Sequence, residues 1–400
     1  MSPQPANNKI WFLLGREPLL SAAELFSLLK INSDSSFEFS PPFLFYQGEI
    51  NKDFINRLGG TIKTGVELGE NLSGQELFDA MKNELEVIDG KITFGISLYG
   101  KNTTPKQVET WGKNLKKELK AGGHSVRYVF NNEATLSSVT VEKNKLAEGG
   151  REFMILQYKD KYSIAITSAV QPFESFGARD FGRPGRDSES GMLPPKLALM
   201  LSNLAQIKPS EVLLDPFCGS GTIISEALLQ GHTNIIGTDL SEKAITDSKT
   251  NIEWLTNKNP EISKATVQIY FQDVKNISSK IKPDSIDAIV TEPYLGKPLR
   301  GNESEMEIKT QAGELLSLYS AAFEQFKKIL RPGGRVVFVI PEFFTKVQPV
   351  VISDKLIPIV QKFGFTVEPL LPKEVSLSPF VLYRRSDQLV GREIWKFKLK

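Results

Sequence analysis

Residues 211–229 read EVLLDPFCGSGTIISEALL. An apolar run with the length of a strand ends at Asp215, a turn with two glycines follows, and a helical stretch then begins. The turn is not a Walker loop, because no Gly-Lys-Ser/Thr follows it, and Ile224 stands where the dinucleotide fingerprint has its third glycine. Gly219 and Gly221 would let the backbone approach a ligand closely, although a glycine turn can also form without one.

The same alternation of strand and helix extends on both sides of this turn. Apolar strands are predicted at 211–215, 234–239, 267–271, 286–291 and 335–341, and helices near 195–206, 221–230, 241–256, 312–330 and 354–363. Nearly continuous apolar strands that alternate with helices indicate an α/β fold with a doubly wound, mostly parallel sheet. Ligands of such folds bind at the carboxyl ends of the strands.

Acidic residues follow three successive strands of this predicted sheet. Asp239 lies 24 positions beyond Asp215, about where an acidic side chain receives the two hydroxyls of a ribose. Asp273 follows the third strand, where it would accept from an adenine amino group or only cap the next segment. Together these acids predict a pocket for a nucleoside without a phosphate.

The fourth strand ends in DAIVTEPYLG, residues 287–296. The simplest interpretation is that Pro293 stops the strand and Glu292 marks the solvent boundary. An acid, a proline and an aromatic residue in succession at a strand end would also be compatible with a functional site.

In this order, DPFCGSGT, GTDL, FQDV and TEPYLG resemble the motifs of class I S-adenosylmethionine-dependent methyltransferases that act on exocyclic amino nitrogens. The resemblance covers roughly residues 186–400. It implies S-adenosyl-L-methionine as the cofactor, with the glycine turn against its methionine part, Asp239 on its ribose and Asp273 on its adenine. The cofactor-binding residues that it implies are Asp215, Pro216, Phe217, Cys218, Gly219, Gly221, Thr222, Asp239, Leu240 and Asp273, with Met192, Leu193 and Pro194 lining the pocket.

The catalytic motif departs from the family pattern of Asp, Asn or Ser followed by Pro-Pro and an aromatic residue. A gapless alignment places Glu292 at the acid position and Tyr294 at the second proline. A one-residue slip instead matches Pro293 and Tyr294 to the proline-aromatic pair and places Thr291 at the acid position. In both alignments Tyr294 is expected near the base. The resemblance implies Glu292, Pro293 and Tyr294 as the catalytic residues: the nitrogen of an exocyclic amine is a poor nucleophile until its N–H groups are held, and Glu292 and the carbonyl of Pro293 would accept those groups while Tyr294 stacks on the base.

The composition limits the other functions open to this 400-residue chain. The only cysteine, Cys218, excludes an internal disulfide framework and a cysteine-rich zinc site, and two distant histidines argue against a histidine metal site. Arg16 and Glu17 interrupt the apolar N-terminal segment, and no run of about 18 apolar residues occurs that could span a membrane. A cytoplasmic protein without a metal is expected.

The net charge of +2 is too small to indicate nucleic-acid binding by itself. Between Lys101 and Arg127, however, seven basic residues face only two acidic ones, which predicts either a solvated helix face or a phosphate-contacting face. The residues expected to contact RNA are Lys113, Lys116, Lys117 and three loop arginines, Arg179, Arg183 and Arg186. Those loop charges would otherwise simply be exposed.

The whole layout is similar to that of the THUMP-containing tRNA guanosine-N2 methyltransferases that act at position ten. We expect a ferredoxin-like α+β module at 1–60, a THUMP-like RNA-binding domain at 61–170, a linker or functional loop without regular structure at 171–190, and the methyltransferase domain at 191–400. The alternatives are an N6-adenine methyltransferase acting on DNA or RNA and a catalytically silent RNA-binding subunit. The sequence leaves open the number of methyl groups added and the need for a small activator protein.

Overall fold

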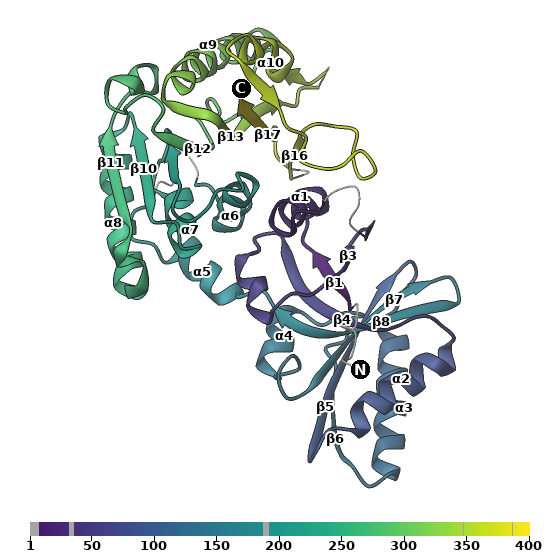
Figure 1. The fold of residues 1–400 in the computed structure, drawn as a ribbon. Coiled ribbons are helices and arrows are strands. Elements are labelled where there is room, and N and C mark those ends of the chain that lie inside the picture. The colour runs from purple at the N-terminus through teal and green to yellow at the C-terminus, as the bar shows by residue number, and fades with distance from the viewer. Residues whose placement is uncertain (1–7, 32–35, 187–191, 347, 386) are drawn as a thin grey trace, which may run out of the picture. The chain divides into compact units, whose positions relative to one another are not determined.

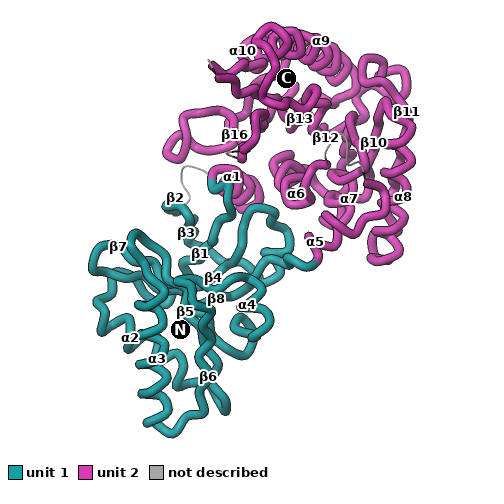
Figure 2. Tube along the Cα trace, turned by 180° about the vertical axis from the view of Figure 1, so that it is seen from behind, with its two compact units in different colours: residues 1–18, 34–174 teal, residues 19–33, 175–400 magenta. Residues whose placement is uncertain are grey.

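The protein is described here from a computed structural model in which residues 8–31, 36–186, 192–346, 348–385 and 387–400 are placed (Figure 1). The chain forms two compact units (Figure 2). Unit 1 comprises residues 1–18 and 34–174, and unit 2 comprises residues 19–33 and 175–400. The two units are described separately.

Unit 2 contains one large, mostly parallel sheet in the order β11-β10-β9-β12-β13-β17-β15. Strands β9 to β13 pair in parallel, and β17 runs antiparallel to β13. The predicted doubly wound sheet is therefore confirmed. The strands are β9 (Val212–Asp215), β10 (Asn234–Asp239), β11 (Thr266–Phe271), β12 (Ile286–Thr291), β13 (Leu330–Phe343), β14 (Val350–Val351), β15 (Phe365–Val367), β16 (Val381–Tyr383) and β17 (Val390–Leu399).

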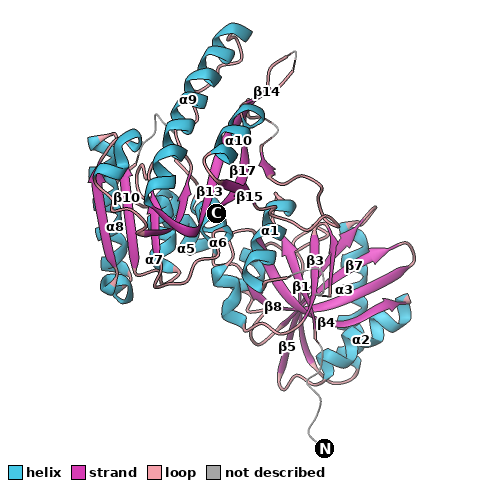
Figure 3. Cartoon of the chain, turned by 45° about the horizontal axis from the view of Figure 1, so that its top comes forward, coloured by secondary structure: helices cyan, strands magenta, loops and turns pink. Residues whose placement is uncertain are grey.

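Helices cover both faces of this sheet (Figures 1 and 3). Helices α6 and α7 lie on one face, with α8 packed beside α7, and helices α9 and α10 lie together on the other. The helical segments of the unit are α1 (Pro18–Leu29), α5 (Phe173–Phe181), α6 (Pro195–Leu204), α7 (Thr222–Leu229), α8 (Glu242–Lys258), η2 (Pro260–Lys264), η3 (Val274–Ser279), α9 (Glu305–Ile329) and α10 (Ser353–Lys362).

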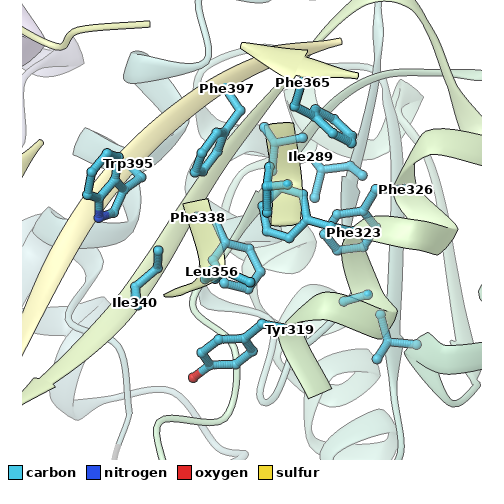
Figure 4. Packing of buried hydrophobic residues seen from close by; sticks show 14 of the residues in the cluster. Ile289, Tyr319, Phe323, Phe326, Phe338, Ile340, Leu356, Phe365, Trp395 and Phe397 are labelled. Atoms are coloured by element: carbon cyan, nitrogen blue, oxygen red, sulfur yellow. The ribbon is translucent and has the colours of Figure 1, made fainter. Parts of the chain in front are cut away.

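The core under α9 contains a group of aromatic rings packed among aliphatic side chains (Figure 4). Phe323 of α9 lies with its ring centroid 5.1 Å from Phe338 of β13, 5.2 Å from Phe397 of β17 and 5.4 Å from Phe365 of β15. Aromatic pairs at these separations add packing energy beyond the area that they bury. The C-terminal strands are therefore part of the core that holds the parallel strands in place.

The strand register brings three acidic residues to one edge of the sheet. Gly237 of β10 is paired with Asp215, so Asp239 ends β10 two residues further along. Ile289 of β12 is paired with Leu214, which places the end of β12 and the following Glu292 beside the same strand tip. Parallel strands end at the same edge, so this register positions the candidate site.

Two parts of unit 2 differ from the sequence-based expectation. The segment 171–190 was expected to lack regular structure, but it contains α5, and its residues 187–190 lie outside the described part of the chain. Buried Phe176 and the ion pair between Arg179 and Glu226 hold α5 by tertiary contacts, which a search for periodicity does not detect. Helix α9 also starts earlier than predicted, at a capping box formed by Ser304 and Glu307.

Unit 1 is built on a single eight-stranded sheet in the order β2-β3-β1-β4-β8-β7-β5-β6. Its strands come from both of the N-terminal modules that the sequence suggested. They are β1 (Lys9–Leu14), β2 (Phe37–Ser40), β3 (Phe43–Gln47), β4 (Thr61–Leu72), β5 (Lys91–Gly100), β6 (Ser125–Val129), β7 (Arg151–Tyr158) and β8 (Lys161–Val170), and the helical segments are η1 (Lys52–Arg57), α2 (Gly74–Glu86), α3 (Pro105–Ala121) and α4 (Ser138–Lys143).

Helices α2 and α3 share one hydrophobic core with strands β5, β7 and β8. Helix α3 begins at Thr104, whose hydroxyl accepts the N–H of Gln107, and Pro105 takes its first position. Its apolar residues Val108, Leu115 and Leu119 are buried. The lysines of α3 consequently occupy the side of the helix that is turned away from the core.

Candidate active site

The glycine turn between β9 and α7 has a backbone that non-glycine residues rarely adopt. Gly219 has φ 51° and Gly221 has φ 81°, which is the left-handed region that favours glycine. A Cβ atom at Gly221 would come within 2.5 Å of the Ser248 hydroxyl oxygen, whereas one at Gly219 would meet nothing within 4 Å. The turn is fixed to β10 because the Cys218 N–H donates to the Thr238 carbonyl at 2.9 Å.

Asp239 at the end of β10 is oriented by this turn. Its Oδ2 accepts the N–H of Gly219 at 2.9 Å, and its Oδ1 accepts the N–H of Ser241 at 2.9 Å. Each carboxylate oxygen has a second lone-pair direction. The partly exposed carboxylate can therefore accept two more hydrogen bonds, as the neighbouring hydroxyls of a ribose would require.

Asp215 at the end of β9 is buried. Its Oδ1 accepts the Thr291 hydroxyl at 2.7 Å and the N–H of Phe217 at 3.3 Å. Burial, with smaller contributions from Asp239 and Glu292, raises the pKa of Asp215 to about 7. Asp215 is thus positioned to hold the glycine turn and β12 together from beneath the site.

The hydrogen bond from Thr291 distinguishes between the two alignments of the catalytic motif. Thr291 is buried and its hydroxyl donates to Asp215, so it does not occupy the place of a group that receives a substrate amine. Glu292, the next residue, is partly exposed. This geometry is compatible with the gapless alignment, in which Glu292 takes the acid position, and the assignment stays a prediction.

Glu292 forms an ion pair that the sequence did not suggest. Its Oε1 accepts the Nε–H of Arg392 at 2.5 Å, and the two side chains are only 15% and 19% exposed. Arg392 lies on β17 opposite Pro341 of β13, 100 positions from Glu292 along the chain. No local pattern could have indicated this pairing, because it depends on where the last strand joins the sheet.

The residues after Glu292 form a fixed loop with one exposed aromatic ring. Pro293 is buried, whereas Tyr294 is 53% exposed. The Tyr294 carbonyl accepts the hydroxyl of buried Tyr319 on α9 at 2.6 Å, and burial raises the pKa of that hydroxyl well above its ordinary value. Among the residues that the structure describes, none donates to the Pro293 carbonyl. The Tyr294 ring thus offers a stacking surface and the Pro293 carbonyl a free acceptor, and the hydrogen bond from Tyr319 anchors the backbone beside them.

The predicted adenine-side residues also lie at the strand ends. Asp273 precedes η3, where its Oδ1 accepts the N–H of Lys275 at 2.9 Å. Leu240 follows β10 and is 63% exposed, and the Phe271 side chain at the end of β11 is also exposed. Exposed apolar side chains beside a carboxylate can pack against a purine ring while the acid accepts its amino group.

The remaining predicted cofactor residues lie in the turn or just before α6. Met192, Leu193 and Pro194 are partly buried just before α6. The Pro216 carbonyl accepts the Thr238 hydroxyl at 3.2 Å, and Phe217 packs against the large core. Burial raises the pKa of the Cys218 thiol, so it remains protonated and unreactive.

The three loop arginines have different environments. Arg179 forms two hydrogen bonds with the buried Glu226 carboxylate, at 2.6 and 3.0 Å. Arg183 is only 6% exposed and donates to the Thr222 hydroxyl at 2.5 Å. Arg186 is exposed. Only Arg186 has the surface position expected of a phosphate contact, because the guanidinium groups of Arg179 and Arg183 lie inside unit 2.

The basic residues of unit 1 form two groups. Lys113, Lys116 and Lys117 lie on α3, where Lys113 pairs with Glu109 at 2.6 Å. A second group, not predicted from the sequence, surrounds an open hollow of about 310 Å³. It comprises Lys91, Arg127, Lys143 and Lys145, and no acidic side chain lines the hollow.

Two further properties concern the described residues only. No helix among them is both long and apolar enough to cross a membrane. Within the same part of the chain, no three histidine, cysteine or acidic side chains are grouped as metal ligands would be.

Comparisons with known proteins agree with this geometry. The family described as RMKL-like, methyltransferase domain, matches residues 183–348. A tRNA (guanine(10)-N2)-dimethyltransferase from Methanocaldococcus jannaschii is 29% identical over 153 residues, which is 38% of each protein. A protein from Methanothermococcus thermolithotrophicus, named a probable tRNA (guanine(10)-N2)-dimethyltransferase, is 31% identical over 123 residues, which cover 30% of this chain and 73% of that relative.

Among solved structures, TrmN from Thermus thermophilus is similar with a TM-score of 0.56 at 16% identity, over 98% of this chain and 100% of that one. At this identity the likeness shows a shared fold. The chain spans less than half of the Methanocaldococcus relative's length.

Proposed function

The chain belongs to the class I methyltransferase family that includes the tRNA (guanine(10)-N2)-dimethyltransferases, and from this premise we propose its reaction. It transfers a methyl group from S-adenosyl-L-methionine to the exocyclic N2 amine of a guanosine in tRNA, at position ten. The observation that carries the proposal is the arrangement of Asp239, Glu292 and exposed Tyr294 at one edge of the parallel sheet.

The residues present fit the cofactor. Asp239 and Glu292 both act electrostatically on Asp215, so three carboxylates influence one small region, and such a cluster favours a positively charged ligand. When bound, S-adenosyl-L-methionine supplies a methyl group on a positively charged sulfur. Asp239 would hold the ribose, and Leu240 with Asp273 would hold the adenine.

Glu292 would hold the substrate amine. Because Oε1 accepts from Arg392, the other oxygen of Glu292 is available for one amine N–H. The Pro293 carbonyl would accept the second N–H. Two acceptors fix the orientation of the nitrogen lone pair and stabilise the positive charge that develops on nitrogen as the methyl group arrives.

Arg392 would keep Glu292 in its working orientation. A carboxylate that is anchored at one oxygen loses little rotational freedom when its other oxygen receives the amine, so preorganisation costs little at the moment of reaction. The arginine acts through Glu292 and touches no reacting atom. It is therefore a positioning residue in this proposal.

Tyr294 would stack on the target base. A base must leave its helix or loop before an exocyclic amine can enter a site of this kind, and an aromatic ring offsets part of that cost at about 1–3 kcal/mol per stacked base. The hydrogen bond from Tyr319 to the Tyr294 carbonyl would keep the ring in a fixed place. The exposure of Tyr294 is consistent with this use.

We propose that the N-terminal part of the chain selects the RNA, with a ferredoxin-like module at 1–60, of which residues 19–33 group with unit 2, and a THUMP-like domain at 61–170. Folded RNA is recognised largely through its backbone, which requires a basic surface. Lys113, Lys116 and Lys117 on α3 supply one such surface. The hollow surrounded by Lys91, Arg127, Lys143 and Lys145 supplies a second. A cytoplasmic setting fits a tRNA substrate.

The proposal can be tested by methyl transfer to tRNA from labelled cofactor. The wild-type protein should label tRNA, and Glu292→Gln should lower turnover by about two orders of magnitude, as loss of one preorganised group does. Cofactor affinity should be unchanged in that variant. Full activity of Glu292→Gln would mean that the acid only ends a strand, and a wild-type protein that binds cofactor but labels no RNA would favour a silent subunit.

A further inference from the structure

Arg183 is a buried cation with unused hydrogen-bonding capacity. It is 6% exposed, and Nη1 donates to the Thr222 hydroxyl at 2.5 Å. Its Nε and Nη2 are buried without an acceptor among the residues that the structure describes. Buried N–H groups of a guanidinium normally have partners, because leaving them unpaired is costly. This arrangement suits an anion that none of the described residues supplies.

The neighbouring charges do not meet this need. Glu226 is the nearby buried acid, but both of its oxygens accept hydrogen bonds from Arg179, at 2.6 and 3.0 Å. Asp180 and Glu226 favour the charged form of Arg183, while Arg186 opposes it, and burial is the largest influence, which lowers the pKa of Arg183. Within the described part of the chain, no carboxylate is hydrogen-bonded to the Arg183 guanidinium.

The position of Arg183 is fixed relative to the glycine turn. The Gly185 N–H donates to Asn251 Oδ1 at 2.7 Å, and Asn251 Nδ2 donates to the carbonyls of Gly185 at 2.8 Å and Ser220 at 2.9 Å. Asn251 therefore joins the arginine loop directly to the turn that precedes α7.

Thr222, which accepts from Arg183, is the first residue of α7. The first N–H groups of a helix are unpaired within the helix, and its dipole favours negative charge at this end. A guanidinium with two free N–H groups beside such a helix start is suited to a carboxylate, which it can hold through two oxygens.

We propose that Arg183 binds the α-carboxylate of the methionine part of S-adenosyl-L-methionine. This inference rests on the proposed function, which places that part of the cofactor against the glycine turn. Because Arg183 is almost fully buried, it suits a small carboxylate that is enclosed with the cofactor better than a phosphate of a folded RNA. The assignment replaces the RNA-contacting role that the sequence suggested for this residue.

Decarboxylated S-adenosylmethionine provides a direct test, because it lacks only the group in question. Isothermal titration calorimetry would compare its affinity with that of S-adenosyl-L-methionine for the full chain and for Arg183→Met. The wild-type protein should prefer the carboxylate-bearing cofactor by about 10- to 100-fold, the value of a hydrogen bond to a charged group. Arg183→Met should lose this preference and bind the two compounds nearly equally.

Two further variants keep the test decisive. Arg331→Met removes a half-exposed arginine that pairs with Asp287, and it should retain the wild-type preference. Arg183→Lys keeps a positive charge without the fork and should show an intermediate preference, which can be measured if Arg183→Met does not fold.

Three results have different meanings. A preference that survives unchanged in the Arg183 variants would overturn the assignment. So would an equal loss of affinity for both compounds, because it would indicate a purely structural role. A wild-type protein that binds neither compound would instead overturn the proposed function.

Discussion

Replacing Arg392 with Met tests whether the ion pair with Glu292 contributes to turnover. The Nε to Oε1 distance is 2.5 Å, and the side chains are 19% and 15% exposed. The pair is thus screened less than a surface ion pair, which contributes about 0–1 kcal/mol. A hydrogen bond between charged groups contributes about 1.5–3 kcal/mol. If the whole of this free energy stabilises the transition state, the kcat of Arg392→Met should be about 10- to 150-fold below that of the wild type.

The assay is a double-mutant cycle on kcat for labelled methyl transfer, with cofactor affinity measured in parallel. Glu292→Gln alone should lower kcat by about 100-fold. If Arg392 acts only through Glu292, the double variant should be no slower than Glu292→Gln to within about 0.5 kcal/mol. Cofactor affinity should stay constant throughout, and Arg392→Lys should recover part of the activity.

Arg384→Met is the matched control. Arg384 lies over the Phe344 ring at 3.4 Å and donates to the Gln388 carbonyl, so it shares the region of Arg392 but pairs with another group. Its removal should change kcat little. Additive effects of the Glu292 and Arg392 substitutions, or an equal loss of kcat in Arg384→Met, would refute the positioning role.

Three further predictions concern the cofactor, pH and RNA. Asp239→Ala should weaken cofactor affinity by about 1–3 kcal/mol, because ribose hydroxyls lose a partner; unchanged affinity in calorimetry would contradict this. The folded-state pKa of Asp215 is about 7, above its unfolded value near 4. The free energy of unfolding should therefore fall as the pH rises from about 4 to about 7, because the carboxyl ionises in the unfolded chain while the buried one stays protonated. In thermal melts of the cofactor-free protein, the stability of Asp215→Asn should depend less on pH in this range than that of the wild type. An unchanged pH dependence would refute the reasoning. Reversing Lys113, Lys116 and Lys117 to Glu should weaken tRNA binding and reduce its salt dependence without altering cofactor affinity; binding as tight as wild type would remove α3 from the RNA surface.

The parallel part of unit 2 could be predicted because its strands are short, buried on both faces and therefore nearly continuous in apolar residues. Strand β12 was predicted with the bounds that the structure has, Ile286–Thr291. The positions of Asp215, Asp239 and Glu292 at one edge then followed from the rule that parallel strands end together.

Other features depend on contacts between distant segments. Strand β17 carries charged side chains, including Arg392 and Lys398, between its buried residues, and no strand was predicted there. The pairing of Arg392 with Glu292 exists only because β17 lies beside β13. The grouping of helix α1 with unit 2 was not predicted, because it depends on contacts such as Asn203 Nδ2 donating to Glu24 at 2.8 Å.

The different environments of the three loop arginines could not be predicted from the sequence either. Arg179, Arg183 and Arg186 look alike in a polar stretch of sequence, and exposed loop charges are the ordinary expectation. Arg179 is paired with buried Glu226 and Arg183 with Thr222, whereas Arg186 is exposed. Only the tertiary structure could assign different roles to the three.

Mass spectrometry of nucleosides shows most directly which atom receives the methyl group. Transfer RNA that lacks the modification would be incubated with the full chain and labelled S-adenosyl-L-methionine, then digested to nucleosides. The account predicts label in N2-methylguanosine or N2,N2-dimethylguanosine, and loss of both products with Glu292→Gln. Label in N6-methyladenosine, or none in guanosine, would contradict it.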